Sequence, residues 1–285
     1  NSIALMRPRV RQSLLTSFMA LADTFMVGIL GETERAAVSM ANSVFFVLAL
    51  VIFGIQSGTG VLVAQYYGKG RLDAINRIMG MGYYVSIGLT AVVALLACLF
   101  PMQMMRIVTN NPDLWEPGAE YSRIVGFSYV CMSFSGVYIA VQRSMENPKL
   151  GAILLTVSGA LNILLNYMLI FGRLGAPAMG CAGAAVATLI SRAFEVVVIL
   201  GCMLWSKRLP INPRLMAKPG KLIAGDFMKY SLPVVLNEGM WSLAMSLFSI
   251  IMAHMPNNTP IVAAYTIAGN IDRLAAVALF AAGNT

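Results

Sequence analysis

The feature that most constrains this chain is a series of long apolar runs, each about as long as a helix that crosses a lipid bilayer. Residues 13–30, for example, carry a single charge, that of Asp23. A helix rises about 1.5 Å per residue, so about 20 apolar residues traverse the hydrocarbon core. The 285 residues are 58% hydrophobic and 11% charged, whereas an ordinary soluble domain carries about 25% charged residues. The pattern excludes a soluble domain and predicts an all-α integral membrane protein, a multi-pass helical bundle.

Eight apolar runs are predicted to be membrane spans, seven of them complete and the eighth running into the end of the chain. Their approximate limits are 12–30, 42–66, 78–100, 119–143, 150–172, 178–205, 230–254 and 260–285. The long connector between the sixth and seventh spans contains three prolines, which is typical of a linker. We therefore expect a six-helix lobe over residues 1–205, a cytoplasmic linker over 206–229 and the start of a second lobe over 230–285.

The basic residues indicate which way the chain crosses the membrane. Fourteen Lys and Arg residues fall before the first span and in alternate connectors from there on, and only three fall in the opposite connectors. Basic loops remain on the cytoplasmic side. The sequence thus predicts a multi-pass protein of the cell (inner) membrane with a cytoplasmic N-terminus and an even number of spans before the linker.

A weak internal repeat accompanies this arrangement. Pro8 aligns with Pro233, and residues 36–41 align with residues 263–268. Both halves enter from the cytoplasm, so the repeat is parallel, and such duplications are frequent in transporters. On this interpretation the whole molecule has about twelve spans and the chain stops inside the second helix of its second half. Chance similarity between two apolar segments is the alternative.

Asp23 is the sharpest functional candidate. It lies inside the first span, where an acid costs about 2.5–3.5 kcal/mol on insertion scales. Such a carboxyl group needs a wet cavity or a partner, and it can bind a proton or a cation. The alternative is a structural acid paired with a neighbouring helix.

Other polar residues in the spans are further candidates, each with a structural alternative. Asn162 and Asn166 are four residues apart on one helix side and can join Asp23 and Thr188 in a polar pocket, or they can merely lock the bundle through hydrogen bonds. Glu238 can line the cytoplasmic mouth of a cavity or lie at the level of the headgroups.

Several features favour structural interpretations. Arg192 and Glu195 are three residues apart, and we expect them to pair with each other. Gly54 and Gly58 indicate close helix packing. The four cysteines lie within or at the end of apolar runs without metal-ligand spacing, so we expect neither a disulfide nor a metal site built on them. No Walker A sequence is present, so ATP is not the energy source within this chain.

Four segments together resemble the multidrug and toxic compound extrusion (MATE) transporters. They are ADTFMVGxxG at 22–31, GTGVLVAQYYGKG at 58–70, LNILLN at 161–166 with IFG at 170–172 and the glycine- and alanine-rich stretch 180–188, and LPxxLNExxWS at 232–242. The resemblance covers essentially the whole chain. It implies a twelve-helix antiporter of two six-helix lobes around a central cleft, exporting amphipathic and often cationic compounds in exchange for Na⁺ or H⁺.

The resemblance also implies roles for particular residues. The first-helix acid of the family corresponds to Asp23, which would bind the coupling Na⁺ or H⁺, and its fifth-helix polar pair corresponds to Asn162 and Asn166. Many relatives have Asp at the second of these positions, so Asn166 leaves the choice of ion open. The predicted coupling site comprises Asp23, Asn162, Asn166 and Thr188. The predicted substrate cleft comprises Gln56, Asn237, Glu238 and Trp241.

The expected partners are a small amphipathic substrate and the bilayer. We expect no nucleic acid, no cofactor other than the coupling ion, no enzymatic activity and a monomer at full length. The alternatives are a lipid-linked oligosaccharide flippase of the same superfamily and a non-transporting membrane subunit.

Overall fold

The computed structural model describes residues 26, 29, 31–109, 111–173, 175–205, 209–218 and 220–253. All regular elements in this part of the chain are helices. They are α2 (Glu32–Tyr67), α3 (Leu72–Leu99), α4 (Pro101–Val108), the 3-10 helix η1 (Pro112–Leu114), α5 (Trp115–Ser144), α6 (Pro148–Phe171), α7 (Gly180–Trp205), α8 (Pro213–Ala217) and α9 (Lys221–Ala253). Asp23 and the predicted first and eighth spans lie outside the described residues, apart from isolated positions at the end of the first.

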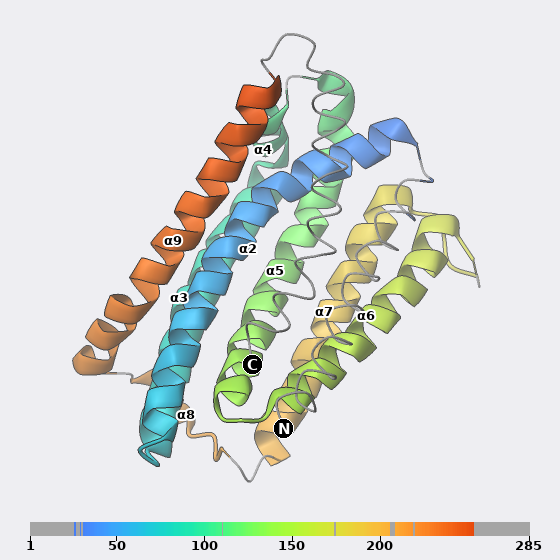
Figure 1. Ribbon diagram of the computed structural model, residues 1–285. Helices are drawn as coiled ribbons and strands as arrows, with labels where there is room; N and C mark the ends of the chain where they lie inside the picture. The colour runs from blue at the N-terminus through green and yellow to red at the C-terminus, as the bar shows by residue number, and fades with distance from the viewer. Residues whose placement is uncertain are drawn as a thin grey trace, which may run out of the picture.

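The long helices form a bundle with α5 at its centre. Helix α5 packs against α2, α3 and α7, while α6 packs mainly on α7 and α9 packs on α2. Figure 1 shows the resulting arrangement, with α9 on one side of the bundle and the α6–α7 pair on the other. Five described helices are long and apolar enough to cross a membrane, which confirms the predicted second to sixth spans.

Proline and glycine punctuate the helices as expected from their backbone preferences. Proline occupies the first turn of α4, η1, α6 and α8, where a missing N–H leaves no helix bond unmade. Gly172 ends α6 with φ 64°, a left-handed conformation that glycine adopts without a Cβ clash. These local signals set where each span stops.

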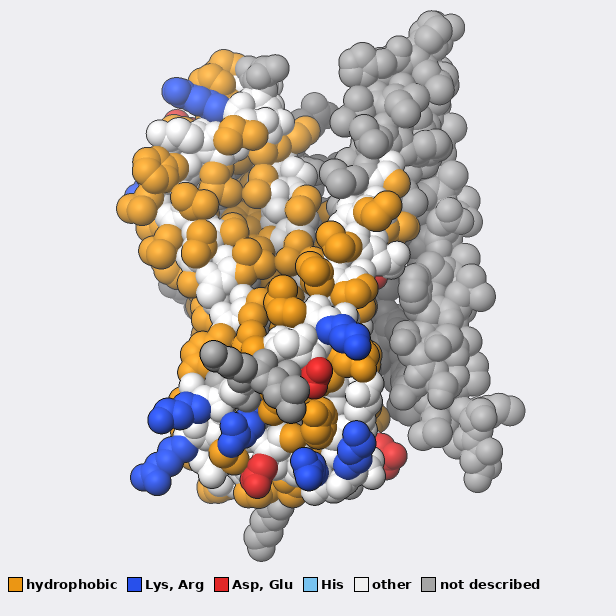
Figure 2. Space-filling view, turned by 90° about the vertical axis from the view of Figure 1, so that its left-hand side faces the viewer, with side chains coloured by type: hydrophobic (Ala, Val, Ile, Leu, Met, Phe, Trp, Pro, Cys, Tyr) orange, Lys and Arg blue, Asp and Glu red, His pale blue; other side chains and the backbone are white. Residues whose placement is uncertain are grey.

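Apolar side chains fill the bundle in two clusters. One contains Phe45, Ile52, Val125 and Ala185, and the other contains Leu62, Ile78, Tyr138, Val141 and Ile199. The outer surface of the bundle is also largely apolar. Figure 2 shows a broad hydrophobic area above an end rich in Lys and Arg. This basic end is formed by the turns α2–α3 and α5–α6, by the end of α7 and by α8. Its described cations include Lys69, Arg71, Arg77, Arg143, Lys149, Arg214 and Lys218.

The close packing predicted at Gly54 and Gly58 is confirmed, and its partner is α9. A Cβ atom at Gly54 would lie 2.9 Å from Cα of Val235, and one at Gly58 would lie 2.6 Å from Cα of Ser231. Neither backbone can give way without separating the helices. The two glycines therefore set the distance between the predicted lobe and the first helix that follows the linker.

Replacing Gly58 with valine is expected to destabilise the bundle by about 2 kcal/mol, because overpacking forces backbone shifts. The measurement is the thermal unfolding midpoint of the purified protein in detergent. Gly88→Val is the matched control, since a Cβ atom at Gly88 on α3 meets nothing within 4 Å. Equal midpoints for the two variants would contradict the close approach of α2 and α9.

The segment predicted as a long linker is more structured than its prolines suggested. Helix α8 occupies its middle, and α9 begins at Lys221, nine residues before the predicted span. The side-chain amide of Asn76, almost fully buried, donates to the carbonyl of Pro210 at 3.0 Å and accepts from the N–H of Asn212 at 3.2 Å. Arg77 donates to the carbonyl of Lys218 at 3.1 Å. The start of α3 thus fixes the described part of the linker in place.

We expect Asn76→Ala to release this segment, because two linker groups lose their buried partner at about 1–3 kcal/mol each. The measurement is the rate of tryptic cleavage after Arg214, which should rise several-fold. Gln103→Ala, at an exposed position on α4, is the control and should leave the rate unchanged. A rate for Asn76→Ala equal to that of Gln103→Ala would mean that other contacts hold the linker.

Candidate functional site

A polar cluster lies between α6 and α7, inside two membrane-spanning helices. Asn166, which is fully buried, donates from its amide to Oδ1 of Asn162 at 3.2 Å. The amide of Asn162 reaches Oγ1 of Thr188 at 3.5 Å, at the upper limit of a hydrogen bond. The Thr188 hydroxyl in turn donates to the carbonyl of Ala184 at 3.0 Å. The structure therefore brings together three of the four residues predicted for the coupling site.

Small residues on α7 explain why these side chains meet. Gly183 lies so close to α6 that a Cβ atom there would be 2.6 Å from the carbonyl oxygen of Leu169. This approach occurs one to two turns before Thr188 on the same helix. Asn162 and Asn166 lie on one side of α6 because residues four apart share a helix side, and this side faces Thr188 of α7. A glycine- and alanine-rich start of α7 is therefore what lets short polar side chains touch across the interface.

The chemistry of the cluster is that of neutral oxygen donors. Amide and hydroxyl oxygens are hard ligands of the kind that bind alkali and alkaline-earth cations. In the described part of the chain, no group of three or more His, Cys, Asp or Glu residues has the arrangement of a metal site. A cation at this cluster would therefore take its negative charge from elsewhere, and the predicted source, Asp23, lies outside the described residues.

The four predicted cleft residues divide into two groups. Asn237 and Trp241 are exposed on α9, one turn apart, and Glu238 beside them is half-buried. Gln56 on α2 instead lies against Gly136 of α5, on the opposite side of its helix from Gly54 and Gly58. Because those two glycines contact α9, the structure separates Gln56 from the α9 residues.

The predicted pairing of Arg192 and Glu195 is confirmed. Nη1 of Arg192 donates to Oε1 of Glu195 at 2.8 Å, with side-chain exposures of 32% and 1%. Sequence reasoning missed the third member, Ser135 of α5, whose hydroxyl donates to Oε2 of Glu195 at 2.8 Å. Its signal was the set of serines in this span, of which Ser122, Ser128, Ser133 and Ser135 are buried. The ion pair thus ties α5 to α7 inside the bundle.

Long apolar helices around a buried polar cluster define a polytopic membrane protein. A family model, MatE, matches residues 8–168, more than half of the chain. The chain belongs to this family, the MATE transporters, which are transporters rather than enzymes.

Curated relatives agree with the family match. The chain is 30% identical over 193 residues to a probable multidrug resistance protein NorM of Thermotoga maritima, which covers 67% of this chain and 41% of that protein. It is 29% identical over 194 residues to a probable multidrug resistance protein YoeA of Bacillus subtilis, covering 68% of this chain and 42% of that one. The chain thus spans about two fifths of the length of these relatives.

Solved structures show the same fold. A MOP superfamily transporter from Pyrococcus furiosus superposes with a TM-score of 0.86 at 23% identity, over 99% of this chain and 62% of that one. An outward-facing multidrug resistance MATE family transporter superposes with the same TM-score, identity and coverage. The predicted all-helical membrane fold is therefore confirmed.

Proposed function

We propose that the full-length protein is a secondary antiporter that exports amphipathic, often cationic, compounds in exchange for Na⁺ or H⁺. The observation that carries the proposal is the hydrogen-bonded cluster of Asn162, Asn166 and Thr188 inside the bilayer-spanning helices α6 and α7. Polar groups at such depth cost free energy to insert into the membrane, and they commonly mark ion or substrate pathways. The multidrug resistance proteins among the relatives support drug-like compounds as the substrate class.

In the proposed mechanism, Asp23 supplies the charge and the α6–α7 cluster supplies neutral ligands or hydrogen bonds around it. Cation or proton binding neutralises the carboxylate and favours release of the drug on the outside. The lobes then rock toward the cytoplasm, where the ion leaves and drug reloads. The ion drives this cycle only through its different affinity for the two states.

The orientation follows from the charges at the ends of the bundle. At least seven described Lys and Arg residues mark the basic end, whereas the described connectors at the opposite end contribute Arg106 and Arg173. We propose that the basic end faces the cytoplasm, with the N-terminus on that side of the inner membrane. The Asn162–Thr188 cluster then lies in the half of the bilayer away from the cytoplasm, since α7 starts at the outer end.

The remaining helices of a longer protein would form the other wall of the cleft, and we propose that such a molecule works as a monomer. Glu238, Asn237 and Trp241 on α9 are placed beyond the linker, on the first helix of that second half. Their exposure or partial exposure is what a cleft-lining position requires.

The flippase alternative is less favoured. A cleft for anionic lipid-linked substrates needs unneutralised cations within the membrane. Arg192, an Arg residue in the middle of a predicted span, is paired with Glu195 at 2.8 Å. The relatives named as multidrug resistance proteins also favour drug export over lipid flipping.

Ethidium transport into inverted vesicles tests the proposal directly. We expect uptake to require an imposed Na⁺ or H⁺ gradient and to stop when an ionophore collapses it. Uptake that is indifferent to both gradients would contradict antiport. Absence of uptake by full-length protein under either gradient, with a range of cationic dyes, would favour a non-transporting subunit.

Within this mechanism, Asn162→Ala is expected to weaken the apparent affinity for the coupling ion about tenfold, equivalent to about 1.4 kcal/mol. The reason is that Asn162 bridges Asn166 and Thr188, so its loss removes one oxygen ligand and both of these hydrogen bonds. The measurement is efflux rate against Na⁺ concentration or pH. Thr156→Val is the control on the same helix, because the Thr156 hydroxyl bonds only the carbonyl of Ala152 among the described contacts. An unchanged ion dependence in Asn162→Ala would remove the cluster from the coupling site.

A further inference from the structure

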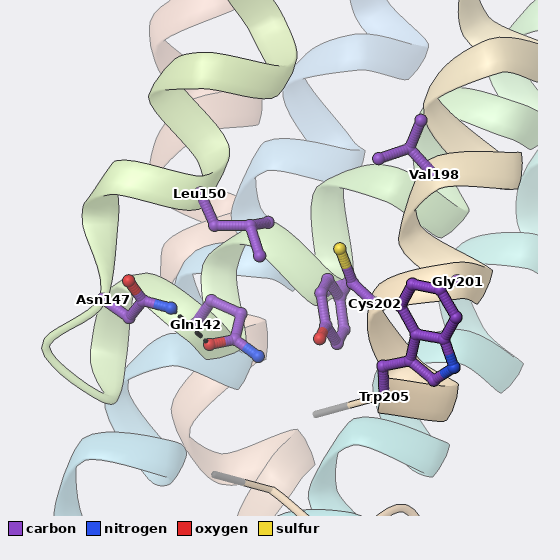
Figure 3. A pocket seen from close by; sticks show the side chains of 8 residues that line it. Gln142, Asn147, Leu150, Val198, Gly201, Cys202 and Trp205 are labelled. Carbon is purple, nitrogen blue, oxygen red and sulfur yellow. Dashed lines mark hydrogen bonds between the residues drawn. The ribbon is translucent and has the colours of Figure 1, made fainter. Parts of the chain in front are cut away.

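An apolar groove runs between α6 and α7 toward the basic end. Two adjoining cavities of about 460 Å³ each share Asn147, Leu150, Val198 and Cys202. The walls along the helices are apolar and comprise Ile153, Leu154 and Val157 of α6 and Phe194 of α7 in addition to these. Figure 3 shows Leu150 and Val198 facing each other across the groove, with Gln142 and Asn147 at one end and Trp205 nearby.

The groove lies on a different side of α6 from the candidate coupling cluster. Val157, in its wall, and Asn162 are five residues apart, which is about 140° around the helix. Side chains beside and within the groove are strongly exposed, at 65% for Ile153, 47% for Val157 and 67% for Val197. Apolar surface of this kind on a membrane-spanning helix meets acyl chains. The groove is thus suited to a ligand that lies parallel to the helices.

Polar and basic groups gather where the groove ends. The amide of Asn147 donates to Oε1 of Gln142 at 3.2 Å, so the polar lining is held together by its own bond. Arg143 and Lys149 are exposed on the adjoining turn, with Glu146 as its one acid. Trp205, 88% exposed, ends α7 in the manner of interfacial aromatic residues, and the sequence continues into Lys207 and Arg208. Cations therefore outnumber acids at this end, and an anionic headgroup complements them.

We propose that the α6–α7 groove binds one anionic phospholipid, with an acyl chain along Leu150, Val157 and Val198 and the phosphate near Lys149. The amides of Gln142 and Asn147 lie between the chain and the phosphate, where they meet the ester groups. The bound lipid bridges α6 and α7 at the basic end, away from the polar cluster. This site does not depend on the proposed antiport.

Gly201 offers a direct way to fill the groove. It lines the groove, and a Cβ atom there meets nothing within 4 Å. Gly201→Phe therefore places a ring in the groove without pushing the backbone. Gly88→Phe is the matched control, because Gly88 is an equally unobstructed glycine on α3. Native mass spectrometry of the full-length protein should show phosphatidylglycerol retained through delipidation by the wild type and by Gly88→Phe. Retention by Gly201→Phe should fall at least about tenfold.

The headgroup is tested separately, in nanodiscs of mixed phosphatidylglycerol and phosphatidylethanolamine. Lys149→Gln should lose the preference for phosphatidylglycerol, and Lys69→Gln, at the α2–α3 turn, should keep it. Phosphatidylglycerol with a photoreactive acyl chain should label peptides covering 150–157 and 194–202. Equal retention by Gly201→Phe and Gly88→Phe would overturn the proposal. Labelling confined to other helices, or labelling of the groove by a photoreactive cationic dye but not by the lipid, would overturn it as well.

Discussion

Replacing Asp23 with asparagine is expected to reduce gradient-driven drug efflux to the level of vesicles without the protein, a loss of about 100-fold or more. Asparagine keeps the size of the side chain but cannot exchange a proton or balance the charge of a cation. An ion that binds both states of the carrier equally shifts neither of them, so the gradient no longer performs work. The measurement is ethidium efflux under an imposed Na⁺ or H⁺ gradient in vesicles with matched amounts of protein.

Two controls accompany this variant. Asp73→Asn changes an exposed acid in the first turn of α3 and should leave efflux intact. The thermal unfolding midpoint of Asp23→Asn should stay at or above that of the wild type, because removing an intramembrane charge does not disfavour insertion. Efflux by Asp23→Asn equal to that of Asp73→Asn would remove Asp23 from the coupling role.

Replacing Glu195 with leucine is expected to destabilise the protein by about 3 kcal/mol. The substitution leaves the Arg192 guanidinium without its 2.8 Å partner, and the Ser135 hydroxyl keeps only its longer bond, at 3.2 Å, to the carbonyl of Met132. Breaking a buried ion pair by removing one member costs about 3–5 kcal/mol, and the partial exposure of Arg192 places the effect at the lower end. The measurement is the free energy of unfolding in mixed detergent micelles.

The double variant Arg192→Leu with Glu195→Leu should recover most of the lost stability, because no uncompensated charge remains. Ser135→Ala should cost less, about 1–2 kcal/mol. Glu120→Leu, at an exposed position on α5, is the surface control and should change the free energy little. A Glu195→Leu protein as stable as Glu120→Leu would show that the ion pair contributes nothing to holding α5 against α7.

The membrane spans could be predicted from the sequence because the bilayer imposes one strong rule, a minimum length of apolar helix. Segments that do not cross the bilayer follow weaker rules, and there the predictions were incomplete. Helix α4 was not predicted, since eight residues with Arg106 and Gln103 among apolar ones have no span signature. The early start of α9 was also missed, because Lys221, Asp226 and Lys229 resemble a polar linker in composition. Contacts of α3 with the preceding segment, such as that of Arg77 with the carbonyl of Lys218, order the chain just before α9, and such long-range contacts are invisible in local sequence.

The candidate site shows the same division between local and distant information. Asn162 and Asn166 were predictable from their spacing of four, and Arg192 and Glu195 from their spacing of three. Ser135 joins Glu195 from 60 positions away, so its role depends on how α5 and α7 pack. Gln56 was predicted to line the cleft, and its contact with Gly136 of α5 follows only from the helix packing, because Gly54 on the opposite side of α2 contacts α9.

Competition between drug and coupling ion at the carboxylate of Asp23 is the central claim, and ion release on drug binding measures it directly. Ethidium is added to purified full-length protein in weakly buffered detergent, while released protons are followed with a pH indicator and released Na⁺ with a sodium-selective electrode. We expect stoichiometric release of one of these ions from the wild type and none from Asp23→Asn. Saturating ethidium binding to the wild type with no release of either ion would contradict the claim.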